Sequence, residues 1–171
     1  DGAFVDAVVA RMLNEHQEEP RHLHDTNGIT LIAVEIDSGL LDQCKQLVTP
    51  ALKGMNHCSC ELIKGDFFRY FMDRKHIGWG GNHANPLGDK FDLIIGNPPF
   101  GGSFAPEIED ELDALLGNRC GIKIKKETYA FFIVACTELL HRGGRLVFIC
   151  SDSLVTIPTM TGLRQYLMTS G

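Results

Sequence analysis

Residues 97–100 read Asn-Pro-Pro-Phe and carry groups that are well suited to chemistry. The side-chain oxygen of Asn97 and the carbonyl of Pro98 can both accept hydrogen bonds, so together they could orient an amine by accepting from its two N–H groups. The ring of Phe100 offers a flat face on which a planar base can stack. Two adjacent prolines stiffen the loop, because each fixes its backbone φ. We therefore interpret Asn97, Pro98 and Phe100 as candidate catalytic residues.

The segment before this loop predicts the strand that positions it. Residues 91–96 read Phe-Asp-Leu-Ile-Ile-Gly, and such an apolar run between breakers is typical of a buried parallel strand. Proline has no N–H to donate to a sheet, so the strand must stop at Asn97. The loop then lies at the carboxyl end of a strand, where open α/β sheets bind their ligands.

A second apolar run, residues 29–34, predicts a strand that ends at Glu35. A carboxylate at this end of a strand can accept hydrogen bonds from both ribose hydroxyls of a nucleoside cofactor. The alternative for Glu35 is a solvated strand end. Asp37 has a simpler role as the N-cap of a helix predicted over residues 38–52.

A third short strand is predicted over residues 60–63, followed by Asp66 and Phe67. Asp66 could merely cap the next helix, with Phe67 in the core, or it could also contact a cofactor. Residues 57–60 read His-Cys-Ser-Cys and suggest zinc, but four-ligand sites need a second matched pair, and none follows at the usual spacing. We therefore expect no metal.

The remaining pattern alternates helices with strands. Apolar spacing predicts helices over residues 4–12 and 127–141, and an apolar run predicts a strand over residues 145–150. Further helices are expected over residues 105–116 and 161–168, and residues 73–90, rich in Gly, Asn and His, are expected to form a loop. The turn Arg142-Gly143-Gly144 is expected to end the helix over residues 127–141. We expect the helix over residues 105–116 to be solvated, because it is rich in acids. The alternation predicts an α/β fold with a doubly wound, mostly parallel sheet.

Length and composition fit a single soluble domain of 171 residues. The longest strongly apolar stretch, residues 129–136, is too short to span a bilayer. Six scattered cysteines are interpreted as reduced thiols, so we expect a cytoplasmic protein without a membrane partner. The net charge is −6, whereas proteins that act on DNA usually carry a basic surface. Either other parts of the protein hold the nucleic acid, or the substrate is something else.

The loop and its strand resemble the catalytic loop of S-adenosylmethionine-dependent DNA adenine-N6 methyltransferases of the restriction-modification type. Residues 127–167 are also similar to that family in their helix, glycine turn and strand. The resemblance implies a Rossmann-like class I methyltransferase fold and S-adenosylmethionine as the cofactor. It implies methyl transfer to the N6 amine of an adenine that is flipped out of duplex DNA, because the amine is unreachable inside the helix.

The resemblance also implies roles for individual residues. Glu35 would bind the ribose hydroxyls of the cofactor, and Ile36 would pack on its adenine ring. Asp66 would accept a hydrogen bond from the adenine amine, with Phe67 against the ring. Asn97 would lie where the cofactor and the substrate amine meet.

Gly2 and Phe4 match the end of the family's glycine loop, which precedes a helix. The alternative is an ordinary amphipathic helix. The family's first strand and first glycine would precede Gly2, so we expect residues 1–171 to form part of a methyltransferase catalytic domain that lacks its N-terminal strand. A target recognition domain is expected to follow Gly171.

Two other functions remain open from the sequence alone. The same chemistry could act on an adenine in RNA or on the amide of a protein glutamine, which the acidic balance fits better. In the resembled family, an Asn at position 97 goes with adenine or glutamine amines, and cytosine-N4 enzymes more often have Ser. The third alternative is a binding module without catalytic activity.

Overall fold

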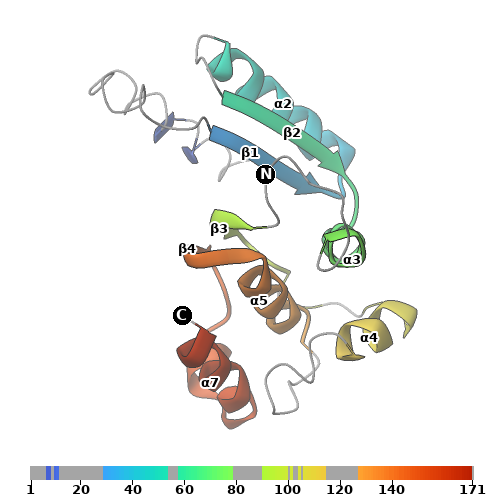
Figure 1. Ribbon diagram of the computed structural model, residues 1–171, viewed down its shortest axis with the longest axis vertical. Helices are drawn as coiled ribbons and strands as arrows, with labels where there is room; N and C mark the ends of the chain where they lie inside the picture. The colour runs from blue at the N-terminus through green and yellow to red at the C-terminus, as the bar shows by residue number, and fades with distance from the viewer. Residues whose placement is uncertain are drawn as a thin grey trace. The chain divides into compact units, whose positions relative to one another are not determined.

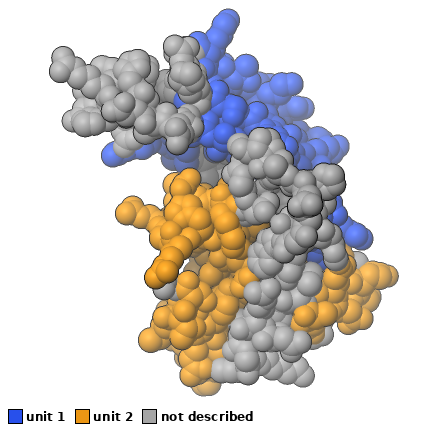
Figure 2. Space-filling view, viewed as in Figure 1, with its two compact units in different colours: residues 1–87 blue, residues 88–171 orange. Residues whose placement is uncertain are grey.

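The computed structural model describes residues 7–8, 10–11, 29–53, 58–78, 90–99, 101, 104, 106–114 and 127–170 (Figure 1). The chain divides into two compact units, Asp1–Leu87 and Gly88–Gly171 (Figure 2). Among the described helices, none is long and apolar enough to cross a membrane.

The first unit contains a parallel strand pair joined by a helix. Strand β1 (Ile29–Glu35) pairs with β2 (Cys58–Lys64), and helix α2 (Ser38–Leu52) connects them and packs against both. A parallel pair requires such a crossover, because the chain must return to the same end of the sheet. Cys44 and Val48 are the buried residues of α2. The predicted strands and helix are therefore confirmed.

Helix α2 begins where the sequence predicts. The carboxylate oxygen Oδ1 of Asp37 accepts hydrogen bonds from the backbone N–H of Gly39 at 2.7 Å and of Leu40 at 3.0 Å. Two of the N–H groups that lack a partner inside the helix are thus satisfied. The predicted N-cap role of Asp37 is confirmed.

Helix α3 (Phe67–Gly78) is longer than predicted, because the loop expected over residues 73–90 begins no earlier than residue 79. Phe68, Phe71 and Met72 are buried at helical spacing. A helix that is nucleated by such packing adds one backbone hydrogen bond for each further residue, so it extends through a polar last turn.

The second unit contains another parallel pair, β3 (Phe91–Gly96) and β4 (Leu140–Phe148), with helix α5 (Thr128–Leu139) leading directly into β4. The helices α4 (Pro106–Leu112), α6 (Ser153–Thr156) and α7 (Thr161–Ser170) and a short 3₁₀ turn, η2 (Pro158–Met160), complete it. The prediction of a solvated helix over residues 105–116 is only partly right, because Leu112 of α4 is fully buried.

The end of α5 differs from the prediction. The helix stops at Leu139, and Leu140 already has extended φ and ψ of −78° and 143°. The pairing of β4 with β3 then shifts between Leu140 and Arg145, so Arg142-Gly143-Gly144 forms an irregularity inside the strand rather than the end of the helix. The turn comes after the paired residues Phe91 and Leu140, which already belong to the β3–β4 ladder, so it lies within β4 and not before it. Gly143 supplies the positive φ of 86° that the turn needs.

The core of the second unit is built on α5. Eight of its residues are buried: Tyr129, Ala130, Phe131, Ile133, Val134, Ala135, Cys136 and Leu139. Leu112, Met160 and Leu163 are buried as well, and α7 packs against α5. By contrast, Leu93 is 48% exposed and Val147 is 51% exposed, so β3 is not buried on both faces as predicted. Burial alternates along residues 144–148 of β4, as expected for a strand covered on one face, whereas β3 shows no such alternation.

The described residues thus form a mixed α/β protein with two parallel strand pairs, as the sequence predicts in outline.

Candidate functional site

The carboxyl end of the first strand pair brings together two of the predicted cofactor-binding segments. Glu35 is in register with Lys64, and the backbone N–H of Gly65 donates to the carbonyl of Glu35 at 3.0 Å. The segments that begin at Glu35 and at Asp66 therefore leave the same edge of the first unit. Open α/β sheets place their ligands at this edge.

The carboxylate of Glu35 is held at this edge by a hydrogen bond to the backbone two residues further along the chain. Its Oε1 atom accepts a hydrogen bond from the backbone N–H of Asp37 at 3.0 Å. This contact orients the carboxylate and leaves its other oxygen available to a ligand hydroxyl. Ile36, the next residue, is 67% exposed, so its apolar side chain is accessible to a ligand at this edge.

Asp66 is the N-cap of α3. Its Oδ1 atom accepts hydrogen bonds from the backbone N–H of Phe68 at 2.9 Å and of Arg69 at 3.0 Å. The capping interpretation is therefore confirmed. Both bonds go to one oxygen, so the cap does not use Oδ2, and the predicted contact with a cofactor amine is compatible with it.

Phe67 is half-buried in an aromatic cluster. Its ring lies 5.3 Å from that of Phe68 in an edge-to-face arrangement and 6.4 Å from that of Phe71 in a stacked one. Such packing fixes the ring direction. With Glu35, Ile36 and Asp66, it gives this edge two carboxylates and two apolar side chains. That set fits the nucleoside part of S-adenosylmethionine, whose hydroxyls and amine donate hydrogen bonds and whose ring is flat.

The second unit carries the Asn-Pro-Pro loop at the carboxyl end of β3. The strand stops at Gly96, as predicted from the prolines. The side chain of Asn97 is exposed, whereas Pro98 is buried. Burial restricts the movement of Pro98, while the adjacent carboxamide remains accessible. This arrangement suits a residue that must meet a substrate.

A second segment leaves the sheet beside this loop, and no predicted site residue lies in it. Gly96 is in register with Phe148, and the backbone N–H of Ile149 donates to the carbonyl of Gly96 at 3.2 Å. Residues 151–153, Ser-Asp-Ser, therefore follow β4 at the edge where Asn97 follows β3. Polar residues directly after an apolar strand are the signal that could have identified them.

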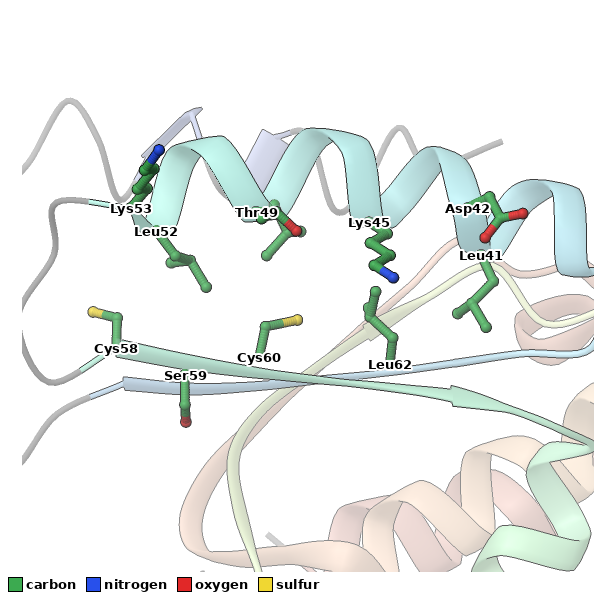
Figure 3. Close-up of a pocket in the computed structure, with 11 residues that line it drawn as sticks. Leu41, Asp42, Lys45, Thr49, Leu52, Lys53, Cys58, Ser59, Cys60 and Leu62 are labelled. Carbon is green, nitrogen blue, oxygen red and sulfur yellow. The ribbon is translucent and has the colours of Figure 1, made fainter.

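A hollow of about 640 Å³ lies between α2 and β2 in the first unit (Figure 3). Leu52 and Thr49 of α2 point toward the strand, while Cys60 and Leu62 of β2 point toward the helix, and Ser59 points away (Figure 3). Eleven residues line it, none of which is a predicted site residue: Leu41, Asp42, Lys45, Val48, Thr49, Leu52, Lys53, Cys58, Ser59, Cys60 and Leu62. The hollow lies along the helix rather than at the strand ends.

Cysteines of β2 line this hollow. In the part of the chain that the structure describes, no group of three or more His, Cys, Asp or Glu side chains could hold a metal ion. Burial raises the pKa of the Cys60 thiol, and the neighbouring Cys44 and Glu61 raise it further. The thiol therefore stays protonated at neutral pH and is a poor nucleophile.

The predicted site residues are thus divided. The first unit gathers Glu35, Ile36, Asp66 and Phe67 at one edge, and the second presents Asn97 and Pro98 at another. The remaining three predicted residues lie outside the described residues: Gly2, Phe4 and Phe100.

Comparison with known proteins identifies relatives. A Type II methyltransferase of Thermus thermophilus, M.TthHB8I, is 31% identical over 90 residues, which cover 49% of this chain. The aligned part spans about a fifth (21%) of that methyltransferase. The family model described as Eco57I restriction-modification methylase matches residues 53–170, from the end of α2 to the end of α7. This match includes Asp66, the Asn-Pro-Pro-Phe loop and the 151–153 segment. The chain belongs to the Eco57I restriction-modification methylase family.

Proposed function

We propose that this protein transfers a methyl group from S-adenosylmethionine to the N6 amine of an adenine in DNA, as part of a restriction-modification system. The observation that carries the proposal is the Asn-Pro-Pro loop, which presents an exposed carboxamide next to a buried proline at the end of a strand. Family membership supports DNA methylation as the reaction, and the adenine N6 position comes from the motif.

The cofactor would bind at the edge of the first unit. We assign the ribose hydroxyls to Glu35 and the adenine amine to Asp66, with Ile36 and Phe67 against the ring. The glycine loop to which Gly2 and Phe4 belong would complete the site. When bound, S-adenosylmethionine supplies a methyl group that is already activated by its sulfonium, so the protein has no need of a metal.

The loop in the second unit would act on the substrate. The exocyclic amine of adenine is a weak nucleophile, because its lone pair is delocalised into the ring. The Asn97 side-chain oxygen and the Pro98 carbonyl would accept hydrogen bonds from the two N–H groups of this amine. Both hydrogen bonds strengthen as positive charge develops on the nitrogen. Phe100 would stack on the flipped base, an interaction worth about 1–3 kcal/mol. Placing the amine in line with the methyl group lowers the barrier further.

The fold and setting of the whole protein are part of the proposal. We expect the two parallel pairs to belong to one doubly wound Rossmann-like sheet, with residues 1–171 forming part of a catalytic domain and a target recognition domain following. A basic recognition domain would supply the contacts to DNA phosphates that a net charge of −6 does not. The scattered cysteines, interpreted as reduced thiols, fit a cytoplasmic enzyme.

The family match favours DNA over the alternative substrates, an RNA adenine or a protein glutamine amide. The direct test offers duplex DNA, RNA and protein to the full-length protein with S-adenosylmethionine that carries a labelled methyl group. We expect label in the N6 position of adenine in duplex DNA. Label in RNA or in glutamine instead would refute the assignment of substrate.

The variant Asn97→Ala tests the mechanism. We expect it to lower methyl transfer by about 10²–10³-fold, the range for losing one group that stabilises developing charge. Gln165→Ala is the matched control, because it removes another exposed carboxamide in the same unit, on α7. Transfer at the wild-type rate by Asn97→Ala would rule the mechanism out.

A further inference from the structure

The edge of the second unit holds two loops side by side. Parallel pairing of Gly96 with Phe148 means that the chain leaves β3 and β4 in the same direction at the same level. The hydrogen bond from the Ile149 N–H to the Gly96 carbonyl, at 3.2 Å, continues this ladder to the last residue before Asn97. The 151–153 segment therefore borders the loop that carries the proposed catalytic amide.

A buried tyrosine holds this segment. The hydroxyl of Tyr129 and the Oγ of Ser153 are hydrogen-bonded at 2.7 Å, and Tyr129 is 1% exposed. Tyr129 lies in the first turn of α5, whose other end continues directly into β4. The first turn of α5 therefore lies at the carboxyl end of β4. A buried hydroxyl needs a partner, so this bond ties the segment to the most buried helix of the unit.

The segment is also held internally and from its far side. The Oγ of Ser151 accepts a hydrogen bond from the Ser153 N–H at 3.2 Å, which closes a local turn. Downstream, the guanidinium of Arg164 on α7 donates to the carbonyls of Leu154 at 2.8 Å and Ile157 at 3.0 Å. Among these anchors, only the Tyr129 hydroxyl acts on the 151–153 segment from α5.

The same helix supports the chain that follows the Asn-Pro-Pro loop. The ring of Phe131, two residues along α5 from Tyr129, contacts Phe104 edge-to-face with centroids 5.5 Å apart. One turn of α5 thus contacts two chain segments, the 151–153 segment and the chain that follows the Asn-Pro-Pro loop.

We propose that Tyr129 and Ser153 are a positioning pair, which fixes the 151–153 segment as one wall of the substrate site beside Asn97. The role in methyl transfer rests on the proposed function. Removing the hydroxyl would let the segment move while the ring still fills the core. Because small misplacements of a reacting group slow a reaction strongly, we expect an effect on kcat rather than on the KM for S-adenosylmethionine.

Tyr129→Phe in the full-length protein is the test, and Tyr166→Phe is the matched control. Tyr166 is also buried, and its hydroxyl donates to Oε1 of Glu138 at 2.9 Å, near the opposite end of α5. We expect Tyr129→Phe to lower kcat about tenfold and Tyr166→Phe to leave it within twofold, although Tyr166→Phe loses a bond to a charged acceptor and so should lose at least as much Tm. Ser153→Ala should match Tyr129→Phe, and the double variant should be no slower than either single variant.

Amide hydrogen exchange over residues 150–157 supplies a readout that does not need activity. We expect faster exchange there in Tyr129→Phe and unchanged exchange in Tyr166→Phe. Unchanged exchange in both variants overturns the positioning pair, whatever the enzyme does. Faster exchange with a wild-type kcat overturns its role in catalysis. If the wild-type protein transfers no methyl group, the proposed function fails, while the exchange result still decides whether Tyr129 holds the segment.

Discussion

Asp66 offers a way to separate the proposed cofactor binding from folding, because the helix cap uses only one of its two carboxylate oxygens. Oδ1 accepts the N–H groups of Phe68 and Arg69 at the start of α3. The cofactor amine would use Oδ2. Asp66→Asn keeps one acceptor oxygen, which the cap takes, and replaces the other with an N–H₂ group that can only donate. Two donors would then face each other where the cofactor binds.

The expected magnitudes differ for the two roles. Asn is as good an N-cap as Asp, so Asp66→Asn should change the free energy of unfolding by only a few tenths of a kcal/mol. Losing a hydrogen bond to a charged acceptor costs about 1.5–3 kcal/mol, which is roughly a 10- to 100-fold rise in the Kd for S-adenosylmethionine. Asp66→Ala should lose both the helix cap and the hydrogen bond to the cofactor. Loss of the cap should lower the free energy of unfolding by about 1 kcal/mol.

Asp37 supplies the matched control on α2. Its Oδ1 makes the same pair of capping bonds, to the N–H groups of Gly39 and Leu40, and it is not assigned to the cofactor. Asp37→Ala should therefore lose about 1 kcal/mol of stability with little change in Kd. Calorimetry with S-adenosylmethionine and urea unfolding measure the two quantities. If Asp66→Asn binds the cofactor with the wild-type Kd, then Asp66 is a cap and nothing more.

Two further predictions concern the irregularity in β4. The two ring nitrogens of His141 form hydrogen bonds with the carbonyl of Arg142 and with the carboxylate of Asp92. These bonds raise the pKa of His141, because only the imidazolium can donate to both oxygens. The stability that these bonds contribute is therefore fully present below the ordinary pKa of about 6.5 and is lost as the pH rises through the raised pKa. Tm measured from pH 5 to pH 9 should therefore fall, and the fall should be smaller in Asp92→Asn. Gly144→Ala should destabilise the protein by roughly 1–3 kcal/mol, because the new Cβ would lie 2.8 Å and 3.0 Å from two backbone oxygens. Gly101→Ala, where the added Cβ meets nothing within 4 Å, is the control, and equal urea midpoints for the two variants would contradict the argument.

The features that the sequence predicts well depend on local chemistry. Asp37 caps α2, and the prolines after Asn97 end β3, because each effect is exerted on residues within one turn or one peptide bond. The placement of Glu35 and Asp66 at one edge follows from the same logic. Parallel strands leave a sheet at the same side, so residues that end two paired strands must be neighbours.

The features that the sequence misses depend on packing or on distant partners. Nothing in the polar composition of residues 73–78 indicates a helix, and only the burial of Phe68, Phe71 and Met72 explains why α3 continues. The border between α5 and β4 is misplaced because Leu140 fits an apolar helix face as well as a strand. The contact between Tyr129 and Ser153 joins residues 24 positions apart, and no local pattern encodes it.

The residues that carry the proposal divide by role as well as by position in the chain. Glu35 and Asp66 follow strands of the first unit and would determine the affinity for the cofactor. Asn97 follows a strand of the second unit and would determine the rate of transfer once both substrates are bound. Asp66→Asn should therefore raise the KM for S-adenosylmethionine with kcat nearly kept, because excess cofactor restores occupancy. Asn97→Ala should lower kcat at any cofactor concentration, since occupancy cannot replace an acceptor that acts on the developing charge.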